Sequence, residues 1–371
     1  MASGLTDYWQ RAVMAGDARG MTPAALRALA ASCARLYEAG LEAYLGLERV
    51  GLRRRERLPV PVVSVGNLTV GGTGKTPMTR LLCRRLTDGG RRVAVLSRGH
   101  GGRGRGVRLV SDAHGNIARS AADAGDEPLL LAQTLPGVPV LVGKDRRQAG
   151  REALRRFALD ALVLDDGFQF WQLARDLDIV LLDARRPFDN GHALPRGLLR
   201  EPARHLSRAG VAVVTRADAL DDTGREALRA RVAALAPVAD LYWARHAATG
   251  LVPVGEFNAP TLPLDALRGR RVLAWSAIAR PDSFAGTLAA TGAEIVAHIA
   301  QPDHYAPAVP DVERVRRRMQ EEHADALVMT EKDAVKWPDV PGVPVYALRV
   351  EMQVEDEVRF LAVVLRRLFG G

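Results

Sequence analysis

The stretch VGNLTVGGTGKTPMTRLL, from Val65 to Leu82, places a glycine-rich loop between an apolar run and a predicted helix. A strand, a glycine-rich turn with one lysine, and a helix follow one another in this order in phosphate-binding P-loops. Backbone N–H groups of such a loop contact phosphate oxygens, while Lys75 would reach the β- and γ-phosphates and Thr76 would bind Mg²⁺. The sequence therefore predicts a nucleotide-binding loop with these residues: Val65, Gly66, Asn67, Leu68, Thr69, Val70, Gly71, Gly72, Thr73, Gly74, Lys75 and Thr76.

One position departs from the usual P-loop pattern. The pattern G-x-x-x-x-G-K-[ST] has glycine where this chain has Thr69, so a strict search misses the loop. The strand, the other glycines, the lysine, the threonine and the helix are all in order. An ordinary tight turn does not explain the lysine, so we interpret the loop as phosphate-binding.

Short β-branched runs alternate with helical stretches along most of the chain. Five runs lie between Val60 and Asp183: VPVVSV, RVAVLS, VPVLVG, DALVLDD and LDIVLLD. This alternation is typical of a doubly wound, mostly parallel α/β sheet, here P-loop NTPase-like. Five further runs begin at Gly210, and we expect them to form a second, smaller α/β domain: GVAVVT, RVLAWS, AEIVAHI, DALVMT and VPVYAL.

An amphipathic helix is predicted before the sheet. Apolar residues recur at helical spacing from Leu26 to Leu45, and arginines cluster just after the helix. An apolar stripe beside arginines suits an anionic membrane surface, although such a stripe more often packs on its own domain. We predict an N-terminal helical segment (1–58), a P-loop core (59–209) and a second α/β domain that contributes to the active-site cleft (210–371).

Composition restricts the class of protein. At 371 residues and 47% hydrophobic, the chain is long enough to bury a full core. Cys33 and Cys83 make no disulfide framework, and the first residues do not read as a secretory signal, so we expect a reducing, cytosolic setting. No window approaches the roughly 18 uncharged apolar residues of a spanning helix, so we expect the protein not to cross a membrane.

The net charge of +9 attracts anionic partners in general. Only four of the 52 basic residues are lysines: Lys75, Lys144, Lys332 and Lys336. A lysine that persists among so many arginines indicates a site where a guanidinium cannot replace a compact ammonium. A nucleic-acid-binding protein is disfavoured, because aromatic residues are 5% of the chain and stacking platforms are scarce.

Two acids end the run ALVLDDGFQ, namely Asp165 and Asp166. Paired carboxylates at the carboxyl end of a strand favour a hard cation. Without a phosphate loop, Asp-Asp-Gly would be an ordinary turn. With the loop, we predict a Mg²⁺ site made by Thr76, Asp165 and Asp166.

Further polar residues follow predicted strands, at the sheet edge where open α/β folds bind ligands. Arg98 of LSRGHGGRGRG could pair with a phosphate, and VGKDRR brings Lys144 and Arg146 to the same edge. DAGDEP places Asp126 and Glu127 just before a predicted helix. Acids there could cap the helix, or one could accept a proton from a hydroxyl nucleophile.

Two motifs near the end of the chain carry further candidates. PDHYAP contains Asp303 and His304, which could be an oriented acid/base pair or a surface histidine with its neighbour. TEKDAVKW carries Lys332, which could meet an anionic ligand, and Lys336, which we expect on a solvated helix face. No Cys/His cluster suggests zinc, and no G-x-S-x-G motif suggests a hydrolase.

Nine motifs in order resemble the tetraacyldisaccharide 4'-kinases of lipid A biosynthesis: SVGNLTVGGTGKTP, LSRGHGG, DAGDEP, GKDR, LDDGFQ, RDLDIVLLD, LPRGLLREP, PDHY and TEKDAVK. They cover the chain from Pro61 to Lys336. The resemblance implies a peripheral enzyme on the cytoplasmic face of the bacterial inner membrane. It would use ATP and Mg²⁺ to phosphorylate the 4'-hydroxyl of a tetraacylated glucosamine disaccharide 1-phosphate, giving lipid IVA. The implied partners are this lipid and an anionic membrane surface, without nucleic acid or an obligate protein partner.

The resemblance also implies roles for single residues. Asp126 would be the catalytic base, His304 its partner, and Lys75 the catalytic phosphate ligand, while the two acids of LDDGFQ would organise the metal. The N-terminal helix would seat on the membrane. Five residues fall at matching active-site motifs as substrate or phosphate contacts: Arg98, Glu127, Arg146, Gln169 and Glu201.

The chain departs from the family at a few positions and also permits another interpretation. Phe170 stands where the family commonly has histidine, and Arg196 and Leu198 replace alanine and proline of the common LPAGPLREP. The string VVTRAD resembles the guanine-specifying T-K-x-D pattern, with Arg216 in place of the lysine. A P-loop GTPase or metallochaperone is therefore the alternative function.

Overall fold

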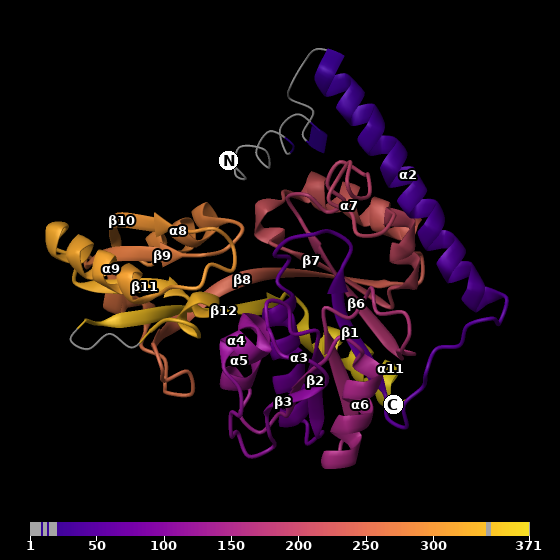
Figure 1. Cartoon of the computed structure of the whole chain (residues 1–371), viewed down its shortest axis with the longest axis horizontal. Helices are drawn as coiled ribbons and strands as arrows, with labels where there is room; N and C mark the ends of the chain where they lie inside the picture. The colour runs from indigo at the N-terminus through magenta and orange to yellow at the C-terminus, as the bar shows by residue number, and fades with distance from the viewer. Residues whose placement is uncertain (1–8, 10–12, 15–20, 339–342, 371) are drawn as a thin grey trace. The chain divides into compact units, whose positions relative to one another are not determined.

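The computed structural model describes residues 9, 13–14, 21–338 and 343–370 (Figure 1). The chain packs as two compact units. Unit 1 combines Met1–Lys75, Asp166–Arg245 and Val354–Gly371, and unit 2 combines Thr76–Asp165 and His246–Gln353. Each unit joins segments that are far apart in the chain. The boundaries at 58/59 and 209/210 therefore stay predictions.

Unit 1 contains a parallel sheet in the order β8-β7-β6-β1. Its strands are β1 (Val62–Asn67), β6 (Leu177–Asp183), β7 (Val211–Thr215) and β8 (Asp240–Pro253), whose last residues belong to unit 2. Its helices are α2 (Met21–Arg49), α7 (Asp222–Leu235) and α11 (Glu357–Phe369), with 3₁₀ turns η2 (Ala203–Arg208) and η3 (Ala217–Ala219).

The run GVAVVT lies in the first sheet and does not begin a separate one, contrary to the expectation from the sequence. This run forms β7, which pairs in parallel with β6, so that Ile179 lies opposite Val211 and Asp183 opposite Thr215. All residues of both strands are buried. The run therefore extends the first sheet, because its β-branched residues fill a place beside an already buried strand.

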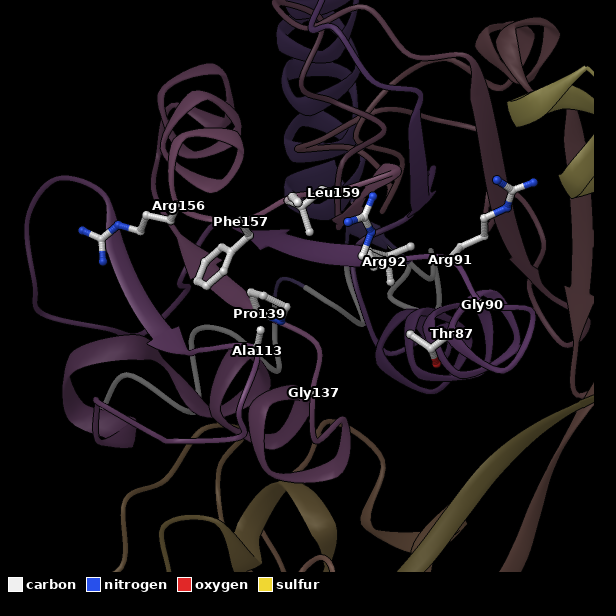
Figure 2. A pocket seen from close by; sticks show the side chains of 12 residues that line it. Thr87, Gly90, Arg91, Arg92, Ala113, Gly137, Pro139, Arg156, Phe157 and Leu159 are labelled. Atoms are coloured by element: carbon white, nitrogen blue, oxygen red, sulfur yellow. The ribbon is translucent and has the colours of Figure 1, made fainter.

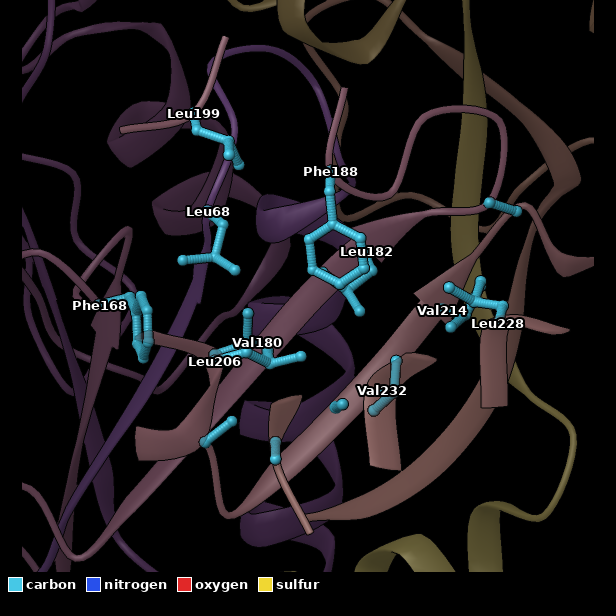
Figure 3. Packing of buried hydrophobic residues seen from close by; sticks show 14 of the residues in the cluster. Leu68, Phe168, Val180, Leu182, Phe188, Leu199, Leu206, Val214, Leu228 and Val232 are labelled. Atoms are coloured by element: carbon cyan, nitrogen blue, oxygen red, sulfur yellow. The ribbon is translucent and has the colours of Figure 1, made fainter. Parts of the chain in front are cut away.

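The core of unit 1 lies on one face of this sheet and includes Leu68, Phe168, Phe188 and Leu199 (Figure 3). The chain passes close to itself here. A Cβ on Gly66 would come within 2.5 Å of the Cβ of Phe168, so only glycine fits at this point of β1. The packing fixes the end of β1, from which the phosphate loop starts.

The predicted amphipathic helix is confirmed as α2, a single long helix (Figure 1). One of its faces is buried in unit 1 and is formed by Ala30, Ala34, Leu41 and Leu45. Another face is apolar and exposed, and carries Met21, Leu29, Leu36 and Leu47. Among the residues that the structure describes, no helix has the length and hydropathy needed to cross a bilayer.

Unit 2 contains two groups of strands. One has the order β5-β2-β4-β3 and is parallel except for β3: β2 (Val93–Ser97), β3 (Arg108–Ser111), β4 (Val140–Val142) and β5 (Ala161–Asp165). The other is parallel in the order β10-β9-β11-β12: β9 (Arg271–Ser276), β10 (Glu294–Ala300), β11 (Ala326–Thr330) and β12 (Val345–Val354). The predicted runs match these strands except β3, which the sequence analysis missed.

The helical elements of unit 2 are α3 (Lys75–Asp88), α4 (Ala121–Ala124), α5 (Asp126–Thr134), α6 (Arg146–Arg156), α8 (Pro281–Ala289), α9 (Val309–Glu321), α10 (Glu331–Ala334) and the 3₁₀ turn η4 (Leu264–Leu267). A buried ion network joins its two segments. Arg80 on α3 lies 3.0 Å from Glu331, and Arg349 on β12 lies 3.0 Å from the same carboxylate. The predicted α/β class is confirmed.

Candidate active site

The phosphate loop lies between β1 and α3, as the sequence predicts. Gly71 and Gly74 have φ angles of 121° and 91°, which are accessible to glycine and strained for other residues. Thr73 is buried, and its hydroxyl accepts a hydrogen bond from Asn67 at 2.9 Å. Its carbonyl accepts one from Thr215 at 3.1 Å. The loop is therefore braced by side chains from two strands of unit 1.

The backbone around Thr69 explains why glycine is absent there. Thr69 forms an antiparallel bridge with Leu199. Val70 N–H donates to the Leu198 carbonyl at 2.8 Å, and Arg200 N–H donates to the Leu68 carbonyl at 2.7 Å. A residue in such an extended bridge has a negative φ, so this position does not require glycine. The side chain of Leu68 is in the core, so only its backbone remains available to a ligand.

Asp166 is held by two cations of unit 1. Nη1 of Arg200 lies 2.8 Å from its Oδ1, and Nζ of Lys75 lies 3.8 Å from the same atom. Asp166 has a φ of 53°, which is uncommon for a residue other than glycine. Sequence reasoning missed Arg200, although it directly precedes the candidate Glu201 in LLREP.

Asp165 is buried at the end of β5. Its Oδ1 accepts a hydrogen bond from Thr79 at 3.1 Å, and its Oδ2 accepts one from Ser97 at 3.4 Å. Across the described part of the chain, no cluster of three or more His, Cys, Asp or Glu side chains could hold a metal ion. Mg²⁺ commonly takes one or two carboxylates, with water and substrate phosphates as its other ligands. The oxygen donors of Thr76, Asp165 and Asp166 are of the chemical kind that such an ion takes, and their role as its ligands stays a prediction.

Glu201 is fully buried and serves as a hub of hydrogen bonds. Gln169 donates to it at 2.8 Å, Nδ1 of His205 lies 2.8 Å away, and Nη2 of Arg208 lies 2.8 Å away. Burial raises the pKa of Glu201, but the hydrogen bond from His205 and the interactions with Arg208 outweigh burial and lower it. Glu201 thus anchors the stretch around η2.

The hub extends to the N-terminal helix. Nε2 of His205 lies 2.8 Å from Oε1 of Glu42 on α2. The other carboxylate oxygen of Glu201, Oε1, accepts a hydrogen bond from the amide nitrogen of Gln169. The amide oxygen of Gln169 in turn accepts a hydrogen bond from Arg200 at 3.2 Å. A continuous set of side-chain contacts within unit 1 therefore leads from α2 to Asp166.

Asp126 is the first residue of α5 and not, as expected, a residue before the helix. Its Oδ2 lies 3.3 Å from Nδ1 of His304 and 2.9 Å from Nζ of Lys336. Burial raises the pKa of Asp126, but the hydrogen bonds from His304 and Lys336 outweigh burial and lower it. The structure brings the predicted base and its predicted partner into contact.

Lys336 corrects one expectation. Only 6% of its side chain is exposed, so it does not lie on a solvated helix face. Its partner Asp126 lies 210 residues away in the chain, which local patterns do not reveal. Lys332 lies 3.0 Å from Asp303, 3.2 Å from Nε2 of His304 and 3.9 Å from Glu127.

Arg98 and Arg146 follow neighbouring strands of unit 2. Arg98 is exposed directly after β2. Arg146 is buried at the first position of α6, and its Nη1 donates to the Lys144 carbonyl at 3.0 Å. Both follow the carboxyl ends of strands, so their predicted placement at that edge agrees with the structure of this unit. Their roles as phosphate contacts stay predictions.

A cavity of about 460 Å³ lies elsewhere in unit 2 (Figure 2). Val93, Pro139 and Leu159 on its wall lie at the amino ends of β2, β4 and β5. The candidate residues follow the opposite, carboxyl ends. The lining residue Arg92 is paired with Asp160 at 2.9 Å, so its charge is already balanced. This cavity is separate from the candidate site.

The fold and the glycine-rich loop between β1 and α3, which ends at Lys75, define a P-loop NTPase-like protein. The sequence model of the family described as "Tetraacyldisaccharide-1-P 4'-kinase" matches residues 26–368. The chain belongs to this family, and it is therefore an enzyme of the kinase class.

Individual relatives agree with the family match. The chain is 46% identical over 311 residues to the tetraacyldisaccharide 4'-kinase of an Anaeromyxobacter species, covering 81% of this chain and 80% of the relative. The enzyme of the same name from Pelobacter propionicus is 42% identical, covering 91% and 90%. A crystal structure of LpxK from Aquifex aeolicus in complex with ATP has a TM-score of 0.74 and 30% identity, covering 91% and 98%. The family resemblance is confirmed, and these matches favour it over the GTPase alternative.

Proposed function

We propose that the chain transfers the γ-phosphate of ATP to the 4'-hydroxyl of a tetraacylated glucosamine disaccharide 1-phosphate, giving lipid IVA in lipid A biosynthesis. The observation that carries this proposal is the contact between Asp126 and His304 in a chain with a P-loop. A phosphate loop alone indicates a nucleotide. A carboxylate paired with a histidine in the same chain adds a group that accepts a hydroxyl proton.

On the donor side, the loop amides and Lys75 bind the phosphates of ATP. Thr76, Asp165 and Asp166 would hold Mg²⁺, which would supply positive charge to the phosphate oxygens. Phosphoryl transfer needs little covalent participation from the protein, so the rate depends on alignment and on stabilisation of developing charge. Arg98 and Arg146 supply further positive charge toward the anionic substrates.

On the acceptor side, Asp126 accepts the proton of the 4'-hydroxyl as that oxygen bonds to the γ-phosphorus. The bond from the γ-phosphorus to the bridging oxygen breaks, and ADP leaves with those electrons. A base of this kind contributes roughly 10²–10⁴-fold to a rate. His304 orients the carboxylate, and Glu127, Gln169 and Glu201 complete the substrate and phosphate contacts directly or through neighbouring side chains.

We also propose that α2 seats the enzyme peripherally on the cytoplasmic face of the inner membrane. One face of the helix is buried in unit 1, whereas Leu29 is 61% exposed and Leu36 is 76% exposed. Apolar residues pointing into water are costly unless they meet another surface. The arginines that follow the helix would meet anionic headgroups. The proposed partners are thus the lipid substrate and the membrane, without nucleic acid or an obligate protein partner.

The proposal is tested by incubating the purified full chain with γ-labelled ATP and the disaccharide 1-phosphate acceptor. We expect labelled product with the phosphate on the 4'-oxygen, and loss of that product in Lys75→Ala. Lys75→Arg should not restore it, because a planar guanidinium does not replace the ammonium at the phosphates. Strong GTP selectivity without lipid phosphorylation would refute the kinase proposal and favour the GTPase alternative.

A further inference from the structure

Charged side chains of unit 2 alternate in sign around the predicted base. Lys336 lies 3.6 Å from Asp333 and 2.9 Å from Asp126. On the other side of Asp126, His304 is followed by Lys332. Two of the four lysines of the chain therefore flank the Asp126–His304 pair, in a protein that otherwise uses arginine as its basic residue.

Lys336 is the more buried of the two lysines, with 6% of its side chain exposed. A buried ammonium is costly unless it is paired, and its nearest carboxylate oxygen is Oδ2 of Asp126. The second neighbour, Asp333, is fixed by Thr330 and by the Ala277 N–H through its Oδ2. Lys336 is therefore held between an anchored acid and the predicted base.

Lys332 decides which nitrogen of His304 carries the proton. Its Nζ lies 3.2 Å from Nε2, and an ammonium donates hydrogen bonds but accepts none. Nε2 must therefore accept, which leaves the ring proton on Nδ1. Nδ1–H then donates to Oδ2 of Asp126 at 3.3 Å.

We propose that Lys336 and Lys332 are positioning residues for the phosphoryl transfer, holding Asp126 as an ionised carboxylate and His304 as the tautomer that donates from Nδ1. This inference rests on the proposed function of the Asp126–His304 pair. Because Nε2 is engaged by Lys332, the proton of the acceptor hydroxyl goes to Asp126 and is not passed to the histidine. His304 acts as a donor that aims the carboxylate.

Other charged groups surround this arrangement. Asp303 and Glu127 share Lys332, and the His100 ring centroid lies 5.5 Å from that of His304. On the elements that pack against α5, the charged residues are Asp123 on α4, Arg108 on β3 and Glu331, Lys332 and Asp333 on α10. Burial raises the pKa of Asp333, which weakens it as a competitor for the charge of Lys336. Asp126 remains the principal partner of that ammonium.

The first test changes Lys336 and follows lipid phosphorylation. Lys336→Met should lower kcat at pH 7 about 10- to 100-fold with nearly unchanged KM for ATP, and Lys336→Arg should recover part of the rate. Without the cation, the pKa of Asp126 rises, so the acid limb of the kcat/KM profile should move up by about one pH unit or more. Arg317→Met, an exposed charge on α9, should change neither quantity.

A double variant separates positioning from a merely structural role. If Lys336 acts through Asp126, then Asp126→Asn/Lys336→Met should be no more than about twofold slower than Asp126→Asn alone. Lower thermal stability with an unchanged pH profile, or full additivity of the two losses, would overturn the role of Lys336. Thermal unfolding of each variant shows whether it is folded.

The second test reads the tautomer of His304 without turnover. In ¹⁵N-labelled full-length protein, with His304→Gln used to assign the signals, Nδ1 should have the shift of a protonated nitrogen and Nε2 that of an acceptor. Lys332→Met should abolish this preference. An Nε2–H tautomer or an imidazolium at pH 7 would overturn the proposal. Since this readout needs no acceptor, failure of the kinase assay and failure of the tautomer assignment are distinguishable.

Discussion

Arg200 and Asp166 form a short ion pair in which Nη1 of the arginine lies 2.8 Å from Oδ1 and 3.0 Å from Oδ2 of the carboxylate. The same guanidinium nitrogen also donates to Gln169 at 3.2 Å. The pair joins the residue proposed to hold Mg²⁺ to the hydrogen-bond hub around Glu201. The carboxylate of Asp166 is therefore oriented by a contact from the stretch that carries the hub.

Arg200→Ala is therefore expected to lower kcat about 10- to 100-fold, since the carboxylate of Asp166 loses the contact that orients it. Arg200→Lys should restore only part of the rate, because the shorter lysine side chain does not bring its ammonium to the position of Nη1, from which both Asp166 and Gln169 are contacted. Steady-state kinetics at saturating ATP measure both. Arg186→Ala, an exposed arginine of the same unit, should retain wild-type activity. Equal rates for Arg200→Ala and the wild type would remove Arg200 from the site.

The parts of the site predicted correctly from the sequence are those whose signals are local. The phosphate loop, its strand and its helix are consecutive residues, and each apolar run predicts one strand. Asp126 and His304 are far apart in the chain, and their pairing was implied by motifs of the family. Spacing alone left open whether Asp126 caps a helix or acts as a base. The resemblance favoured the base, and that role stays a prediction.

The predictions that were wrong or missing share one cause: they depend on contacts between residues that are far apart in the sequence. Lys336 was expected in solvent because its neighbours in the sequence give no sign of its partner Asp126. Arg200 was missed because its partner Asp166 lies 34 residues away in the chain. Likewise, the run that forms β7 was not expected to extend the first sheet, because the order of strands in a sheet cannot be read from a single apolar run. In each case the local sequence pattern does not reveal the tertiary contact that determines the structure.

Asp126→Asn should lower kcat about 10²–10⁴-fold and leave the KM for ATP within about twofold, because the base acts on the acceptor hydroxyl and not on the nucleotide. The lowered pKa keeps Asp126 ionised across neutral and mildly acidic pH. The wild-type kcat/KM profile should therefore show no acid limb from this residue above about pH 4. Asp282→Asn, an exposed acid on α8, is the matched control. A weakened ATP affinity with unchanged kcat would make Asp126 a nucleotide ligand.

Glu201→Gln should destabilise the protein by about 1–3 kcal/mol at pH 7, because Arg208 and His205 lose a buried carboxylate partner. The pKa of Glu201 is lowered in the folded protein, so its stabilisation is fully present above the unfolded pKa of about 4.3. It is lost as the pH falls through the lower folded pKa, and the wild type and variant should converge there. Urea unfolding at several pH values measures the difference. Glu226→Gln, at an exposed pair, should change stability by less than about 0.5 kcal/mol.

The exposed apolar face of α2 gives the last prediction. Leu29→Glu/Leu36→Glu should weaken sedimentation with vesicles that contain anionic phospholipid about tenfold or more, because each change removes apolar area and adds repulsion. The buried face of α2 is untouched, so activity on detergent-dispersed acceptor should be retained. Val238→Glu, which alters an apolar side chain 70% exposed elsewhere in unit 1, should sediment like the wild type. If the double variant sediments as well as the wild type, α2 is not the membrane-binding surface, and its leucines must then contact something other than lipid.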